Sequence, residues 1–204
     1  MTARERWVFL GDSVTDSGRT TGGPPTGDGY VSRIAHAVTE RGLDVEVLNR
    51  GVNGDQAADV LRRVESDCIE LAPDLVSIMV GVNDTWRRYD SDAPVPLEAF
   101  TAAFDALVDR LRSVARVVVM TPFLLPVAPG QGEWLIDDLG PKIEVERASA
   151  RRVGAAIVDA QSAMEMSACA PMDLAFDGVH PTAAGFDTLA AAWIAEVLPA
   201  GTAR

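Results

Sequence analysis

Residues that together can perform nucleophilic catalysis lie near the two ends of this chain. Ser13 follows an apolar run in "WVFLGDSVTD", and His180 lies in "FDGVHP", three residues after Asp177. A serine hydroxyl becomes a nucleophile when a histidine takes its proton, and a carboxylate bonded to the imidazole fixes its tautomer. The chain has only one other histidine, His36, which falls in a helical pattern where a structural role is expected. Taken alone, Gly-Asp-Ser is also an ordinary turn, and the segment from Asp177 to His180 is also a simple helix entry.

The elements that would position these residues alternate regularly along the chain. Short, apolar, β-branched segments predict five strands, at residues 6–11, 44–49, 74–81, 115–121 and 155–160. Amphipathic segments predict helices at residues 29–42, 55–71, 96–114, 140–154 and 182–198. This alternation predicts a mostly parallel sheet with helices on both faces. Such sheets carry their functional residues at the carboxyl ends of the strands, where "GDS", "NRGVNGD" and "GVND" occur here.

Length and composition restrict the class of protein. A chain of 204 residues, 48% of them hydrophobic, predicts one domain over residues 1–204. A net charge of −12 argues against a nucleic-acid partner. No apolar stretch approaches the roughly 18 residues that a membrane span needs, and "MTARERWVFLGD" reads as a first strand, not a secretory signal. We therefore expect a cytoplasmic protein. Cys68 and Cys169 show neither metal-ligand spacing nor a disulfide framework.

Four sequence blocks, in a fixed order, carry a family resemblance. They are "GDS" near the N-terminus, "NRGVNGD" with Gly54, "GVND" with Asn83, and "DGVHP" near the C-terminus. The G-x-S-x-G elbow of α/β-hydrolases is absent. Each block alone is weak evidence, but together they are specific, and the chain resembles the SGNH, or GDSL-type, hydrolases. This resemblance implies an α/β fold, a flavodoxin-like three-layer α/β/α sandwich with a five-stranded parallel sheet.

The resemblance also implies roles for the residues in these blocks. It assigns Ser13 as nucleophile, His180 as general base and Asp177 as the residue that orients the histidine. It assigns the oxyanion hole to the backbone N–H groups of Ser13 and Gly54 and to the side-chain amide of Asn83. The physical requirement agrees, because a tetrahedral intermediate needs preorganised hydrogen-bond donors. This chemistry requires no metal and no cofactor.

A finer resemblance suggests the substrate. The stretches "GDSVTDSGR", "NRGVNGDQAADVLRR", "DLVSIMVGVNDTWRRYD" and "MTPF" are similar to the intracellular acetyl xylan esterases of this family. They predict a serine esterase that hydrolyses O-acetyl esters of xylo-oligosaccharides or related small-molecule sugars. Trp86, Arg87 and Tyr89 follow the predicted oxyanion residue and would suit a sugar, although packing at a loop base explains them equally well. Phe176 stands before the triad aspartate where the resemblance predicts a tryptophan, and it is also a candidate for substrate binding.

Other functions remain open at this point. Residues 121–140 form the longest segment expected to be irregular, a pocket-lining or lid loop. Its apolar part, with Phe123 as a candidate substrate contact, would line an acyl tunnel in a lysophospholipase or thioesterase, or lie at a contact in a homo-oligomer.

Two alternatives come from outside the class. In a magnesium-dependent phosphatase of the haloacid-dehalogenase type, a D-x-D pattern is expected, but Val14 stands two positions after Asp12, and Lys142, the only lysine, is far along the chain. A non-catalytic binding module would have no need of an intact triad.

Overall fold

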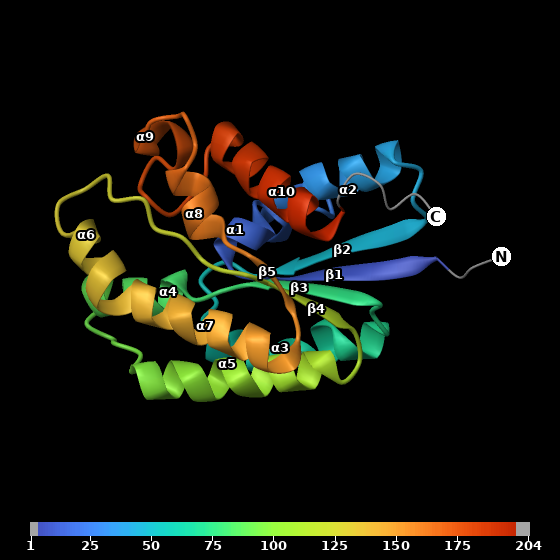
Figure 1. Cartoon of the computed structure of the whole chain (residues 1–204), viewed down its shortest axis with the longest axis horizontal. Helices are drawn as coiled ribbons and strands as arrows, with labels where there is room; N and C mark the ends of the chain where they lie inside the picture. Colours follow the sequence, from blue (N-terminus) through green and yellow to red (C-terminus); the bar gives the residue numbers. More distant parts are fainter. Residues whose placement is uncertain (1–3, 199–204) are drawn as a thin grey trace.

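The computed structural model describes residues 4–198, and within them five parallel strands form one sheet (Figure 1). The strands are β1 (Glu5–Gly11), β2 (Val45–Gly51), β3 (Leu75–Met79), β4 (Arg116–Met120) and β5 (Ala156–Val158). Their spatial order is β2-β1-β3-β4-β5. The chain therefore moves outward in one direction from β1 to β2 and in the other from β3 onward, which creates a switch point at the carboxyl ends of β1 and β3. The predicted strands are confirmed.

Helices cover both faces of this sheet (Figure 1). One face carries α2 (Tyr30–Glu40), α8 (Ala160–Glu165), α9 (Pro171–Leu174) and α10 (Ala183–Val197). The other carries α3 (Ala57–Asp67), α5 (Leu97–Arg112) and α7 (Gly140–Val153). Short 3₁₀ turns lie at Arg19–Thr21 and Ile69–Leu71. The three-layer α/β/α sandwich is thus confirmed. Among residues 4–198, no helix is long and apolar enough to cross a membrane.

Strand β1 shows why the sheet is covered on both sides. Its side chains alternate, so Trp7 and Phe9 enter one core, whereas Val8 and Leu10 enter the other. Both aromatic rings pack on Trp193 of α10, at centroid distances of 5.7 and 5.4 Å. Each fully buried side chain of this kind contributes about 1.5–3 kcal/mol relative to exposure. The central strand is therefore a rigid support for the loop that follows it.

Within residues 4–198, five short helices have no counterpart in the predicted pattern. Two of them are α8 and α9. The others are α1 (Ser13–Asp16), α4 (Val82–Asp90) and α6 (Gln131–Trp134), and a π-helical turn (Leu135–Leu139) continues α6. Each short helix follows a strand or loop end, where the apolar period is too brief to detect.

The expectation of an irregular loop over residues 121–140 is correct only for its first ten residues. Phe123, Leu124 and Leu125 are only 1–3% exposed and lie in the hydrophobic cores. These three side chains therefore pack in the interior of the fold. A main-chain bond holds the segment against the loop that precedes α10, because Leu125 N–H donates to Gly178 O at 2.9 Å.

Candidate active site

Asp177 and His180 are brought together by the short loop that precedes α10. The carboxylate oxygen Oδ1 of Asp177 accepts the backbone N–H groups of Val179 (3.0 Å) and His180 (2.7 Å). Its second oxygen, Oδ2, lies 2.7 Å from His180 Nδ1. Gly178 permits this turn, because its φ is +89° and a Cβ there would lie 2.4 Å from Leu125 O. We call residues 177–180 the acid–base loop.

Ser13 meets this loop from the other end of the chain. It is the first residue of α1, directly after β1, and Asp12 caps the helix by accepting Val14 N–H at 3.0 Å. Ser13 Oγ lies 3.1 Å from His180 Nε2, although the two residues are 167 positions apart. Hydrogen bonds therefore join serine, histidine and aspartate in one chain. This arrangement can move a proton from the hydroxyl to the imidazole.

The electrostatic state of Asp177 suits this arrangement. Partial burial would raise the pKa of its carboxyl, but hydrogen bonds from the His180 ring and from the His180 and Val179 backbone outweigh burial and lower the pKa. The carboxylate therefore stays ionised at neutral pH and can stabilise an imidazolium beside it.

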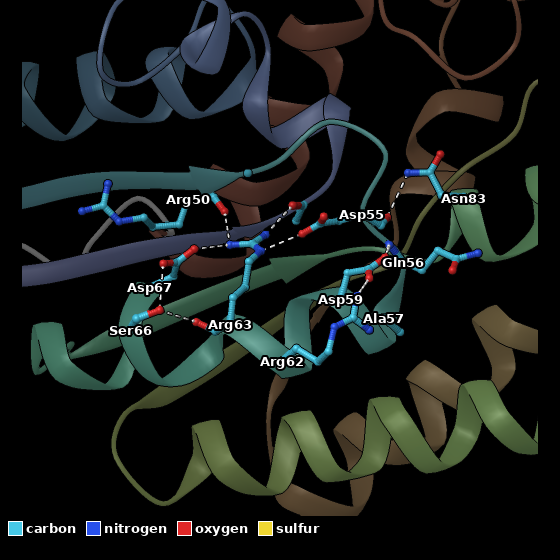
Figure 2. A network of polar contacts seen from close by, with 12 residues as sticks. Arg50, Asp55, Gln56, Ala57, Asp59, Arg62, Arg63, Ser66, Asp67 and Asn83 are labelled. Atoms are coloured by element: carbon cyan, nitrogen blue, oxygen red, sulfur yellow. Dashed lines mark hydrogen bonds and ion pairs between the residues drawn. The ribbon is translucent and has the colours of Figure 1, made fainter.

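The three predicted oxyanion donors lie in the segments that follow β1, β2 and β3. The Ser13 N–H is the first amide of α1 and has no partner within that helix. Gly54 adopts a φ of +86° in the loop after β2. Asn83 lies in the first turn of α4, is 6% exposed, and donates one side-chain N–H to Asp55 O at 2.9 Å, as Figure 2 shows. Its amide group carries a second N–H for another acceptor. We call the three residues predicted to donate to an oxyanion, Ser13, Gly54 and Asn83, the oxyanion side.

Buried charged residues lie behind the oxyanion side. Burial raises the pKa of Asp12 to about 7 and that of Asp84 to about 6, against the opposing hydrogen bonds that each accepts. Burial and the nearby Asp84 and Asp12 carboxylates raise the pKa of Glu146 well above its usual value. Lys142 is fully buried and bonds to Asp138 at 2.7 Å. This cluster could not be predicted from the sequence, because its members come from separate segments of the chain.

Aromatic side chains surround His180. Its ring centroid lies 5.7 Å from that of Trp86 and 6.1 Å from that of Phe176, which is 62% exposed. Trp134 lies 6.3 Å from Trp86 and stacks on Tyr89 at 4.6 Å. Trp134 was not among the predicted site residues, because it falls in the segment expected to be irregular. These rings form an aromatic surface beside the histidine.

Two other predicted substrate contacts have different surroundings. Phe123 is 1% exposed and packs in the hydrophobic core, and its contact with substrate stays a prediction. Arg87 pairs with Asp90 on its own helix.

Gln131 is a residue that the sequence did not indicate. It is 4% exposed, and its Oε1 accepts the N–H groups of Val127 and Ala128, both at 2.9 Å. Its Nε2 donates to Asp177 O at 2.7 Å. Gln131 therefore ties the segment after β4 to the acid–base loop.

The doubly wound parallel sheet, with Ser13, His180 and Asp177 joined at its carboxyl edge, defines the class of SGNH-type hydrolases. The sequence model of the GDSL-like Lipase/Acylhydrolase family matches residues 9–187, and the chain belongs to this family. It is a carboxylic ester hydrolase.

Relatives with names and solved structures agree with this class. An acetylxylan esterase of Geobacillus stearothermophilus is 32% identical, over 95% of this chain and 94% of the relative. A crystal structure of an acetylxylan esterase from that organism superposes with a TM-score of 0.83 at 31% identity, covering 94% of this chain and 93% of the other. An alpha/beta hydrolase from the metagenome of Lake Arreo, Spain, gives a TM-score of 0.85 at 29% identity, with 96% of each chain covered. An arylesterase of Vibrio mimicus is 28% identical over 69% of this chain and 66% of the relative.

Proposed function

We propose that this chain removes O-acetyl groups from xylo-oligosaccharides or related sugars, through an acyl-enzyme on Ser13. The observation that carries the proposal is the hydrogen-bond chain from Ser13 Oγ through His180 to Asp177, with distances of 3.1 and 2.7 Å. These distances are within reach for proton transfer before substrate binds.

The proposed reaction has two stages. His180 Nε2 takes the Ser13 proton while Oγ attacks the acetyl carbonyl carbon, and Asp177 stabilises the imidazolium. The resulting oxyanion accepts hydrogen bonds from the Ser13 and Gly54 N–H groups and from the Asn83 amide. His180 then returns the proton to the leaving sugar oxygen, which leaves acetyl-Ser13. In the second stage, His180 takes a proton from water as the water oxygen attacks the acetyl carbon. His180 then gives this proton to Ser13 Oγ as the carbon–Oγ bond breaks, which releases acetic acid, ionised to acetate at neutral pH, and free Ser13.

Two observations support a sugar acetate as the substrate. The relative that is 32% identical over nearly its whole length is named acetylxylan esterase. Trp86, Phe176 and Trp134 present rings on and around His180, and flat aromatic faces with nearby polar donors suit a sugar ring. In this proposal Tyr89 supports Trp134 by stacking on it.

The test is a substrate panel. Acetate release from acetylated xylobiose is measured beside hydrolysis of p-nitrophenyl esters with acyl chains from acetyl to octanoyl. The proposal predicts hydrolysis of the sugar acetate and a steep fall in kcat/KM as the acyl chain lengthens. Ser13→Ala serves as the control for background hydrolysis. A preference for octanoyl esters with no acetate released from the sugar would overturn the proposed substrate while leaving the nucleophile in place.

A lysophospholipase or thioesterase has less support from the structure than from the sequence. This alternative assumes that the apolar run from Phe123 to Val127 lines an acyl tunnel. Three of its side chains are instead buried in the hydrophobic cores. The same panel decides between the two, because a lipid acyl esterase would favour the long chains.

A further inference from the structure

Arg63 on α3 contacts more of the active-site framework than its place in the sequence suggests. Its Nε donates to Asp55 Oδ2 at 2.6 Å, and its Nη2 donates to Gly11 O at 3.1 Å. Its Nη1 donates to Arg50 O and to Asp67 Oδ2, both at 2.8 Å. Figure 2 shows the guanidinium at the centre of these partners. One planar group thus joins the ends of β1 and β2 to α3 and to the loop between β2 and α3.

These partners are adjacent to the residues of the oxyanion side. Gly11 is two residues before Ser13, and Asp55 directly follows Gly54. The backbone oxygen of Asp55 also accepts the side-chain N–H of Asn83 at 2.9 Å. Gly54 and Asn83 are therefore two covalent or hydrogen-bonded residue steps from the Arg63 guanidinium, and Ser13 is three.

The burial of this network makes it strong. The Arg63 side chain is 17% exposed and that of Asp55 is 13% exposed. Hydrogen bonds between ionised groups that are shielded from water are stronger than those on the surface. Only a guanidinium offers five N–H donors in a fixed plane, so a lysine at this position would keep the charge but lose most of the contacts.

We propose that Arg63 is a positioning residue of the active site, which holds Gly11 and Asp55 so that the donors of Ser13, Gly54 and Asn83 converge on the oxyanion. This rests on the proposed function, because it assumes the oxyanion roles of those three residues. Arg63 does not touch the reacting atoms. Its effect is on the geometry of the transition state, where a displacement of about 1 Å can cost about a hundredfold in rate.

The neighbouring arginine supplies a matched control. Arg62 lies on the same helix and pairs with Asp59, with its side chain 70% exposed (Figure 2). Arg62→Lys and Arg63→Lys make the same chemical change one residue apart. Surface ion pairs contribute little to stability, so Arg62→Lys is expected to be close to neutral.

The experiment measures kcat and KM of both variants on p-nitrophenyl acetate, per active site. Active sites are counted with a p-nitrophenyl phosphonate, which forms a Ser13 Oγ–phosphorus bond and releases one p-nitrophenolate per active site. We expect Arg63→Lys to lower kcat by about 10- to 100-fold with KM changed less than threefold, and Arg62→Lys to stay within twofold of wild type. An equal kcat per active site in the two variants would overturn the proposal, because Arg63 would then only stabilise the fold.

A double variant tests whether Arg63 acts through the oxyanion side. If it does, Arg63→Lys in an Asn83→Ala background should lower kcat less than it does in the wild type, because one of the donors it positions is already gone. Full additivity of the two losses would contradict this mechanism.

Two further variants keep the outcome interpretable. If Arg63→Lys does not fold, Asp67→Asn replaces it as the test, because Asp67 contacts Arg63 from the last residue of α3. We expect it to lower kcat about two- to tenfold, and an unchanged kcat would overturn the proposal. Ser13→Ala separates this inference from the proposed function. Full activity in Ser13→Ala refutes the function itself, whereas its loss together with an unaffected Arg63→Lys refutes only the role of Arg63.

Discussion

Asp177 and His180 belong to one four-residue loop, whereas Ser13, Gly54 and Asn83 come from segments that follow three different strands. In the acid–base loop, the bonds that fix the carboxylate span two or three residues. On the oxyanion side, the corresponding bonds span 28 residues from Asn83 to Asp55 and 52 from Arg63 to Gly11. The first half of the site is therefore set by local sequence, and the second depends on tertiary structure.

Asn83 also differs from the acid–base loop in its exposure to solvent. The side chains of His180 and Asp177 are 38% and 30% exposed, and Ser13 and Gly54 are also partly exposed, whereas Asn83 is only 6% exposed. A group that exchanges protons with water needs access to it, whereas donors to an oxyanion act most strongly where water is excluded. Variants in the two halves should therefore fail in different ways.

The largest effect is expected from breaking the acid–base loop. Asp177→Asn retains an oxygen that can accept the backbone N–H groups, but it removes the negative charge opposite His180. By analogy with the same change in other serine hydrolase triads, kcat should fall by about 10⁴-fold with little change in stability. Steady-state hydrolysis of p-nitrophenyl acetate and urea unfolding measure the two quantities. Retention of even a tenth of the wild-type kcat would show that His180 does not need this carboxylate.

A smaller loss is expected on the oxyanion side. Asn83→Ala removes one donor of a set, so kcat should fall by about 10²- to 10³-fold while KM is nearly unchanged. The donor stabilises the transition state and not the bound ester, and separate measurement of kcat and KM tests this. A rise in KM at constant kcat would instead place Asn83 in ground-state substrate binding.

The connection between the segment after β4 and the acid–base loop can be tested at Gln131. Gln131→Met keeps the volume but removes an acceptor of two N–H groups and the donor to Asp177 O. Leaving buried polar groups without partners should lower the free energy of unfolding by about 1–3 kcal/mol. Since Asp177 would be held less firmly, kcat should also fall by roughly 3- to 30-fold. A loss of stability without any change in kcat would confine Gln131 to a structural role.

The smallest effect on activity is expected from a substitution of Glu146. Its carboxyl group instead makes the stability of the fold depend on pH. No hydrogen-bond partner is present for either of its carboxyl oxygens within residues 4–198, and its side chain is fully buried. The pKa of Glu146 in the folded protein is raised above its value in the unfolded chain. The stability that this group contributes is therefore fully present below about pH 4.5 and is lost as the pH rises through the folded pKa. Asp12 and Asp84 contribute with the same sign, with folded pKa values of about 7 and 6.

The wild type should therefore lose stability between pH 5 and pH 8, and Glu146→Gln should lose less. Each unit of raised pKa is worth about 1.4 kcal/mol at high pH, and about 1 kcal/mol shifts Tm by roughly 2–4 °C in a chain of this size. Thermal unfolding at both pH values measures the difference. Equal falls in Tm for the two proteins would show that Glu146 is ionised in the folded state.

The contrast between local bonds and tertiary contacts explains which parts of the fold and the site could be predicted from the sequence. The order of strands and long helices followed from apolar periodicity, because each strand is buried on both faces and each long helix on one. The Asp177–His180 pair could be proposed from a spacing of three residues. The roles of the oxyanion side came only from a family resemblance, and nothing local distinguished Gly54 or Asn83 from turn residues.

The sequence could not identify the residues that act through tertiary contacts. Arg63 and Arg62 are identical in type and adjacent, yet one is buried in a network and the other exposed. Lys142 looked remote from the site but is buried behind it. Phe123 looked like a substrate contact because an apolar run after a strand has the same composition whether it faces a pocket or the core. Only the folded structure shows which of these side chains are buried and which are exposed.

The most direct test of the central claim is to identify the residue that becomes covalently modified. The intact protein is treated with a p-nitrophenyl phosphonate, digested, and mapped by mass spectrometry, with Ser13→Ala treated in parallel. One phosphonyl group per chain on the peptide that contains Ser13, none on the variant, and a fall of about 10⁶-fold in the variant's kcat on p-nitrophenyl acetate are the predicted results. Modification at another residue, or ester hydrolysis by Ser13→Ala at the wild-type rate, would contradict the account.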